Sequence, residues 1–166
     1  MTDVSDMDNV KGDGLEPTGA PIWAIIASGL LVLVGLGIAI YMTYEHFTGS
    51  TTLACSTTSF VNCLKVTTSA QSYFLGIPVA VLGLGFFVTA ACFYNPMAWR
   101  SHRRWVHQIR LGLAIISMLF VLWLLYAELI VIGSICEYCT GVHLVTFALF
   151  VVTMIATPSV LSSAQD

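Results

Sequence analysis

Four long apolar runs constrain this chain more than any other feature of its sequence. A helix needs roughly 20 apolar residues to cross the hydrocarbon core of a bilayer, which is about 30 Å thick. Hydrophobic residues make up 57% of the 166 residues and charged residues only 9%, well below the roughly 25% of soluble domains. The sequence therefore predicts an all-α integral membrane protein, a four-transmembrane-helix bundle over residues 21–157, with spans at about 22–44, 75–94, 109–133 and 136–157.

The segments between the runs predict an orientation. The loop between the second and third spans, with the start of the third, holds all four arginines of the chain, Arg100, Arg103, Arg104 and Arg110. Because cytoplasmic loops are enriched in Lys and Arg, we expect this loop and both termini in the cytoplasm. Residues 1–20, rich in acidic side chains, are expected to form a disordered tail, and residues 158–166 a short polar tail. This charge pattern gives no indication of nucleic-acid binding.

Four of the five cysteines lie in segments that this orientation places outside the cytoplasm. Cys55 and Cys63 fall in the long loop of about residues 45–74, and Cys136 and Cys139 form a C-x-x-C pair at the start of the fourth span. The free N–H groups of a first helical turn favour a thiolate, which is the nucleophile of thiol–disulfide exchange. Since disulfides persist outside the cytoplasm, the pattern favours two redox-active pairs on one face of the membrane.

Two non-catalytic roles for these cysteines stay open from the residues alone. They could form static disulfides, or all four could bind one Zn²⁺. Zinc sites usually have two tight C-x₂₋₄-C pairs, whereas seven residues separate Cys55 from Cys63, so we expect no metal. Cys92, the fifth cysteine, is expected to be a small apolar side chain in the second span.

A relay of electrons through both pairs fits the other residues. One pair would meet a soluble protein, and the pair at the edge of the bilayer would meet a lipid-soluble two-electron carrier such as a quinone. His143 follows Cys139 by one helical turn, and Glu128 lies at a similar depth on the third span. Ionisable residues in a membrane tend to face the bundle interior, so we expect both to contribute to a quinone site. The alternative is structural: an interhelical hydrogen bond for His143, and packing against a polar backbone end for Glu128. Tyr138 is a further candidate for the lining of the quinone site.

The ordered set of motifs resembles the vitamin K epoxide reductase family in its bacterial form. The set comprises four spans, the loop cysteines, Ser69 six residues after Cys63, Gly76-Ile77-Pro78 at the start of the second span, and Cys136-Glu137-Tyr138-Cys139 at the start of the fourth. The similarity covers about residues 20–157. It implies a multi-pass protein of the cytoplasmic membrane whose four helices surround a quinone, either ubiquinone or menaquinone.

The resemblance also implies a role for each cysteine. Cys139 would lie beside the quinone, Cys63 would attack Cys136, and Cys55 would exchange with a secreted thioredoxin-fold (DsbA-like) partner that is a separate chain. The implied reaction is oxidation of the partner's dithiol with reduction of the membrane quinone, which would support disulfide formation in exported proteins.

Two polar residues have implied roles as well. Ser69 would hold the loop over the bundle, and His143 stands where some relatives have a tyrosine that hydrogen-bonds the quinone. The direction of electron flow stays open, because the same relay could serve as a quinone or vitamin K epoxide reductase with another thiol donor.

Overall fold

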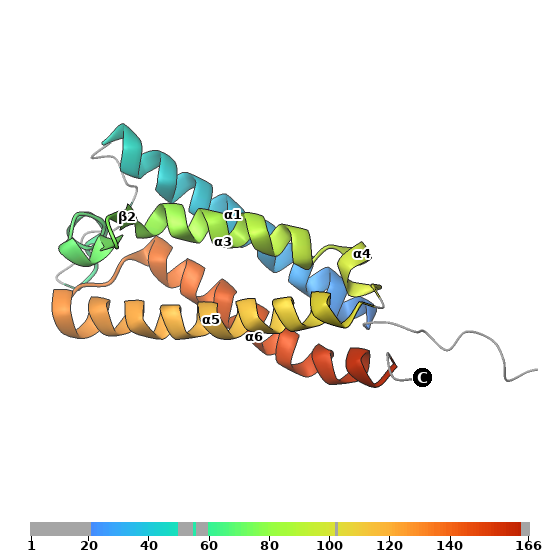
Figure 1. Cartoon of the computed structure of the whole chain (residues 1–166). Coiled ribbons are helices and arrows are strands. Elements are labelled where there is room, and N and C mark those ends of the chain that lie inside the picture. The colour runs from blue at the N-terminus through green and yellow to red at the C-terminus, as the bar shows by residue number, and fades with distance from the viewer. Residues whose placement is uncertain (1–20, 50–54, 56–59, 102, 164–166) are drawn as a thin grey trace, which may run out of the picture.

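In the described part of the chain, four long helices carry a small cap, residues 60–78, at one end (Figure 1). The structure is a computed structural model that describes residues 21–49, 55, 60–101 and 103–163, with side chains up to residue 158. The elements in chain order are α1 (Ile22–Thr48), α2 (Cys63–Thr67), η2 (Ala70–Ser72), β1 (Tyr73–Phe74), β2 (Ile77–Pro78), α3 (Val79–Phe93), α4 (Pro96–Trp99), α5 (Arg104–Tyr126), η3 (Ala127–Ile132) and α6 (Glu137–Ser163). The tails expected at 1–20 and 164–166 lie outside the described residues.

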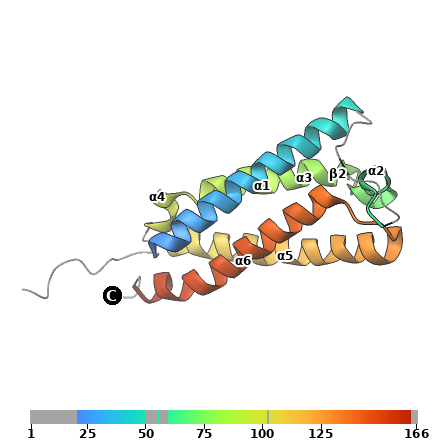
Figure 2. The same ribbon diagram turned by 180° about the vertical axis from the view of Figure 1, so that it is seen from behind.

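The long helices pack as a bundle with an apolar exterior. α1 packs against α3 and α6, and α5 packs against α6 and, to a lesser extent, α3 (Figures 1 and 2). Within the described residues, three stretches are long and apolar enough to cross a membrane, namely Ile22–Thr48, Arg104–Ile132 and Glu137–Pro158. The remaining expected span corresponds to α3, an apolar helix of 15 residues. The chain is thus an all-α membrane protein.

Small residues let α1 and α3 approach closely in the middle of the bundle. A Cβ atom added to Gly35 of α1 would overlap the ring of Phe87 of α3, which is completely buried. Helices in a bilayer gain little from the hydrophobic effect, so close van der Waals packing at small residues is a main source of their association. This contact fixes how α1 and α3 enclose the space between them.

A buried cation holds together the end of the bundle opposite the cap. α5 begins at Arg104, earlier than the expected start near residue 109, and Arg110 is only 1% exposed. Its guanidinium group lies 3.7 Å from the centre of the Trp99 ring and donates to the carbonyls of Phe93 and Ala98. These contacts offset the loss of hydration of the Arg110 guanidinium group. α5 can therefore include residues that were expected to belong to the arginine-containing loop between the second and third spans.

The second span begins differently from the sequence-based prediction. Tyr73–Phe74 and Ile77–Pro78 form a two-stranded antiparallel hairpin instead of continuing a helix from Leu75. Leu75 and Gly76 both have positive φ, 52° and 82°, as a two-residue type I′ turn requires. Pro78 is therefore the residue before α3 and not part of its first turn. The hairpin was missed because leucine rarely adopts a left-handed conformation.

Two helices continue beyond their expected ends. α1 runs one turn further, to Thr48, and stops at Gly49, whose left-handed conformation (φ 60°) commonly closes a helix. α6 continues past Pro158 to Ser163. A proline removes one backbone hydrogen bond, which a long helix of a membrane protein can tolerate. The tail predicted for residues 158–166 is thus helical as far as residue 163.

Gly35→Ala should destabilise the fold through its contact with Phe87. Extra methyl groups in a well-packed interior cost about 1–3 kcal/mol, so the thermal unfolding midpoint in detergent micelles should fall. Gly37→Ala is the matched control, because nothing lies within 4 Å of a Cβ at that position, and its midpoint should stay the same or rise slightly. Equal midpoints for the two variants would contradict the close contact between α1 and α3.

Candidate functional site

A short backbone seam joins the cap to the residues that precede α6. The Ile135 N–H donates to the Phe60 carbonyl at 3.0 Å, and the Asn62 N–H donates to the Ile135 carbonyl at 3.1 Å. Val61 and Ile135 form a parallel β-bridge at this point. We call these residues, 60–62 and 135, the seam. It places the residues before Cys63 beside the residue before Cys136.

α2 starts directly after the seam and carries Cys63 as its first residue. The Asn62 side chain caps this helix by accepting the Lys65 N–H at 3.0 Å, which satisfies one of the free amides of the first turn. Cys63 and Cys136 are 1% and 0% exposed and belong to one apolar cluster, with Cys55 and Cys139 packed against it. The structure thus brings the two predicted cysteine pairs together.

The loop pair is a disulfide, and the C-x-x-C pair is two thiols. Cys55 and Cys63 are bonded, with Cα atoms 6.2 Å apart, whereas Cys136, Cys139 and Cys92 are free. A zinc ion on four cysteines would need all four as thiolates, so the bonded loop pair does not fit that alternative. The two pairs therefore differ in redox state within one apolar cluster.

Interactions at the start of α6 favour a thiolate at Cys136. The Cys139 N–H donates to the Cys136 Sγ at 3.4 Å. A hydrogen bond from the Cys139 side chain holds the pKa of the Cys136 thiol below its ordinary value, against the opposing effect of burial. The thiolate is the reactive form in thiol–disulfide exchange. Cys136 is therefore the cysteine of the C-x-x-C pair whose reactive form is favoured by its surroundings.

An apolar cavity of about 580 Å³ lies between the long helices and the cap. Residues from α1, α3, α5, η3, α6 and the cap line it, and Cys139, Glu128, His143 and Ser69 are among them. Small-molecule sites usually measure about 300–1,000 Å³ and combine apolar walls with a few polar groups. The cavity thus has the size and the lining of a site for a largely apolar ligand that reaches Cys139.

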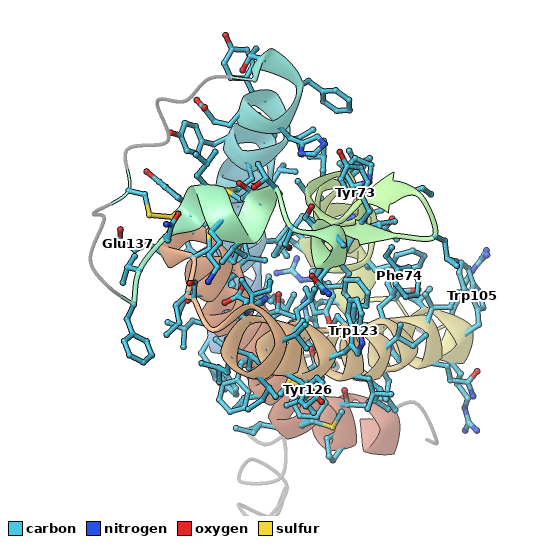
Figure 3. The ribbon with its side chains drawn as sticks, turned by 90° about the vertical axis from the view of Figure 1, so that its left-hand side faces the viewer. Tyr73, Phe74, Trp105, Trp123, Tyr126 and Glu137 are labelled. Carbon is cyan, nitrogen blue, oxygen red and sulfur yellow. A yellow bond between two sulfur atoms is a disulfide. The ribbon has the colours of Figure 1, made fainter. Side chains whose placement is uncertain are left out.

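The hairpin of the cap closes one side of this cavity. Phe74 packs edge-on against Phe120 and Trp123 of α5, with ring centres 5.5 and 5.7 Å apart (Figure 3). The Tyr73 hydroxyl lies 3.3 Å from His46 Nε2 at the end of α1. The first strand of the hairpin, β1, thus contacts both α1 and α5, which keeps the cap over the cavity.

Two buried ionisable side chains line the cavity near Cys139. Glu128 is 5% exposed, and its carboxyl group interacts with the Cys139 thiol and the Cys136 backbone. It lies in η3, a π-helical segment, and such segments often occur at functional sites. His143 is also 5% exposed, and its Nδ1 has no hydrogen-bond partner within the described residues. A buried polar atom of this kind is suited to a polar group of a ligand.

Ser69 and Tyr138, the other two predicted residues of the site, have different surroundings. Ser69 lines the cavity, and its hydroxyl donates to the Val66 carbonyl at 2.7 Å, so it stabilises the turn that follows α2. Tyr138 is not among the lining residues, and its ring packs against Tyr41 of α1 with centres 5.1 Å apart. Ser69 therefore helps to shape the cavity, whereas Tyr138 packs between α6 and α1.

Sequence reasoning did not single out several residues of the site. Thr146 lines the cavity three residues after His143 on α6, and the helical period could have identified it. Tyr73 and His46 also line it, but their contact depends on the unexpected hairpin. Lys65, which contacts the segment before Cys136, carries no motif that marks it in the sequence.

Comparison with known families agrees with this arrangement. The family model described as "Vitamin K epoxide reductase family" matches residues 26–154. The match extends from the first turns of α1 nearly to the end of α6 and includes the cap, both cysteine pairs and the residues around the cavity.

The lowered pKa of Cys136 gives a pH-dependent prediction. In a reduced variant that lacks Cys55, Cys63 and Cys92, a thiolate should persist at a lower pH than for an ordinary cysteine, as measured by thiolate absorbance near 240 nm. Removing Cys139 as well should raise the midpoint, because the hydrogen bond that stabilises the thiolate is lost. Removing Cys136 instead should abolish the low-pH signal. A midpoint that does not rise without Cys139 would contradict the assignment.

Proposed function

The chain belongs to the vitamin K epoxide reductase family, an oxidoreductase family, and from this premise we propose that it oxidises a protein dithiol and reduces a membrane quinone. Members of the family use quinone-type redox partners. The observation that carries the proposal is the position of the two cysteine pairs. Cys63 and Cys136 share one buried cluster, and Cys139 lines the apolar cavity.

The first step involves the loop disulfide and the soluble partner. A thiolate of a thioredoxin-fold protein attacks Cys55, the Cys55–Cys63 bond breaks, and Cys63 leaves as a thiolate. The second thiol of the partner then displaces Cys55, so the partner leaves with a disulfide and the loop holds two thiols. Cys63 is almost completely buried and Cys55 is less so, which supports Cys55 as the sulfur that the partner reaches.

The second step moves the electrons inside the protein. After a previous turnover Cys136 and Cys139 are joined, and the Cys63 thiolate attacks Cys136 so that Cys139 becomes the leaving thiolate. Cys55 then displaces Cys136 from Cys63, which restores the loop disulfide and leaves two thiols at the start of α6. That distribution, a bonded loop pair and a free C-x-x-C pair, is the one observed.

The cavity fits the head group of a quinone by its size, its apolar walls and its unpartnered histidine. When bound, a quinone accepts two electrons and two protons. His143 Nδ1 is a buried polar atom that can hydrogen-bond a ring oxygen. Glu128 interacts with the Cys139 thiol, so its carboxyl group can take the proton of that thiol as Cys139 reacts. Ser69 keeps the turn after α2 over the site.

We further propose that all four long helices cross the cytoplasmic membrane, with the cap outside the cytoplasm. α3 has 15 residues and is thus about 22 Å long, shorter than a typical span. The apolar hairpin that precedes α3 belongs to the cap and lengthens this apolar segment. The exposed cations Arg100, Arg103 and Arg104 at the opposite end support a cytoplasmic location for that end.

A trapping experiment tests the partner step. In Cys63→Ala the Cys55 thiolate can attack the disulfide of an oxidised partner, and Cys63 is no longer present to displace Cys55 from the resulting mixed disulfide. We expect purified membranes of this variant to contain a covalent complex with a thioredoxin-fold protein that dissociates on reduction. The complex should be missing from the Cys55→Ala/Cys63→Ala control. Equal capture by the control would show that Cys55 is not the point of exchange.

A second prediction concerns the cavity residues. Glu128→Gln keeps the shape of the side chain but removes its proton transfer, and should slow quinone reduction by the reduced protein about 10²-fold or more. His143→Ala should chiefly raise the quinone concentration needed for half-maximal rate. In both variants the exchange between the cysteine pairs should stay near the wild-type rate, as followed by alkylation and mass spectrometry. Unchanged quinone reduction in both would assign them to packing alone.

A further inference from the structure

Lys65 is an exposed residue whose ammonium group nevertheless has two specific acceptors. Its Nζ donates to the Ile132 carbonyl at 2.8 Å and to the Ser134 hydroxyl at 3.2 Å. These acceptors lie 67 and 69 residues further along the chain. Lys65 belongs to α2 of the cap, so the two hydrogen bonds connect the cap to the end of the third long helix.

The acceptor segment is the turn between η3 and Cys136. Ile132 is the last residue of η3, and Gly133 follows it in the left-handed conformation with φ of 63°. The N–H groups of Gly133 and Ser134 both turn back to the Glu128 carbonyl. The carbonyl groups at the end of a helix lack intrahelical partners and carry partial negative charge, so a cation is favourable there. The Lys65 ammonium supplies that cation.

Lys65 and its acceptor Ser134 lie at equal sequence distances from Cys63 and Cys136, the two cysteines between which the proposed exchange takes place. Lys65 lies two residues after Cys63, and Ser134 lies two residues before Cys136. The seam fixes the residues that precede Cys63 to Ile135, and Lys65 fixes the helical turn that follows Cys63 to Ser134. Together they leave α2 little freedom to rotate or to lift away from the start of α6.

We propose that Lys65 is a positioning residue for electron transfer between the two cysteine pairs, because its two hydrogen bonds hold Cys63 in line with Cys136. The step it serves is attack of the Cys63 thiolate on Cys136 of the Cys136–Cys139 disulfide. The Cys63–Cys136 bond forms, the Cys136–Cys139 bond breaks, and the electron pair leaves on the Cys139 sulfur. Displacement at sulfur depends on alignment of three sulfur atoms, so a loosely held α2 slows it. The inference rests on the proposed relay, but its geometry can be tested without a quinone.

The direct test uses a chain that retains only Cys63 and Cys136, with serine at positions 55, 92 and 139. Diamide converts the two thiols to a disulfide and is itself reduced to a hydrazine, and the rate of this conversion reports how often the sulfurs meet. Lys65→Met should lower the rate about tenfold, in line with loss of hydrogen bonds from a charged donor. Lys65→Arg should retain most of the rate. Arg103→Met, which removes an exposed cation from the opposite end, should have no effect.

The same variants in the four-cysteine protein separate this inference from the proposed function. The fully reduced protein holds two electron pairs, and Cys136 and Cys139 deliver the first directly to added quinone. The second pair must pass from Cys63 to Cys136, so Lys65→Met should slow only the second phase of quinone reduction. Equal rates for Lys65→Met and wild type, in cross-linking and in the second phase, would overturn the inference. Absence of both phases in the wild type would overturn the proposed function, and cross-linking would still decide the role of Lys65.

Ser134→Ala gives an independent variant in case Lys65→Met does not fold. It removes one of the two acceptors and leaves the Ile132 carbonyl in place, so the cross-linking rate should fall by a smaller factor, about twofold to threefold. A Ser134→Ala rate equal to that of the parent, together with an unfolded Lys65→Met, would assign Lys65 to stability alone and contradict the positioning role.

Discussion

The hydrogen bonds of the seam are the interaction on which the arrangement of the site depends. Ile135 accepts a hydrogen bond from Asn62 and donates one to Phe60, so a segment in the first half of the chain is fixed to the residue before Cys136. The apolar runs alone would form the long helices without fixing which loop residues lie beside the start of α6. The seam determines that Cys63, and not another part of the loop, shares a buried cluster with Cys136.

The chemistry at the cavity follows from an irregular helix end. α5 widens into the π-helical η3, and Gly133 then reverses the chain. As a result the Glu128 side chain is held next to Cys139, while the backbone carbonyl of Glu128 accepts hydrogen bonds from the N–H groups of Gly133 and Ser134. Burying a carboxyl group and a histidine in an apolar bundle is unfavourable. The fold tolerates this cost because extensive contacts of α1 with α3 and with α6, such as that of Gly35 with Phe87, stabilise the rest of the bundle.

Much of this could be predicted from the sequence, and the failures have physical causes. Apolar runs predicted the long helices, and the spacing of cysteines with His143 and Glu128 predicted residues that do line the cavity. The hairpin was missed because Leu75 adopts a conformation that local propensity disfavours. The contacts of Tyr138 and Lys65 depend on how distant segments meet, and a single sequence does not contain that information. The helix ends differed by a few residues, since cap and packing contacts determine them.

The proposed function depends above all on the transfer of electrons from the cysteine pairs to a membrane quinone. The most direct measurement is the redox state of Cys136 and Cys139 in intact cells, fixed by acid and read by alkylation and mass spectrometry. We expect these two cysteines to be mostly disulfide-bonded when quinone is abundant and to accumulate as thiols when quinone synthesis is blocked. Cys92, which lies outside the relay, should stay a thiol in both conditions. If the redox state of Cys136 and Cys139 is the same with and without quinone, these cysteines do not pass electrons to it.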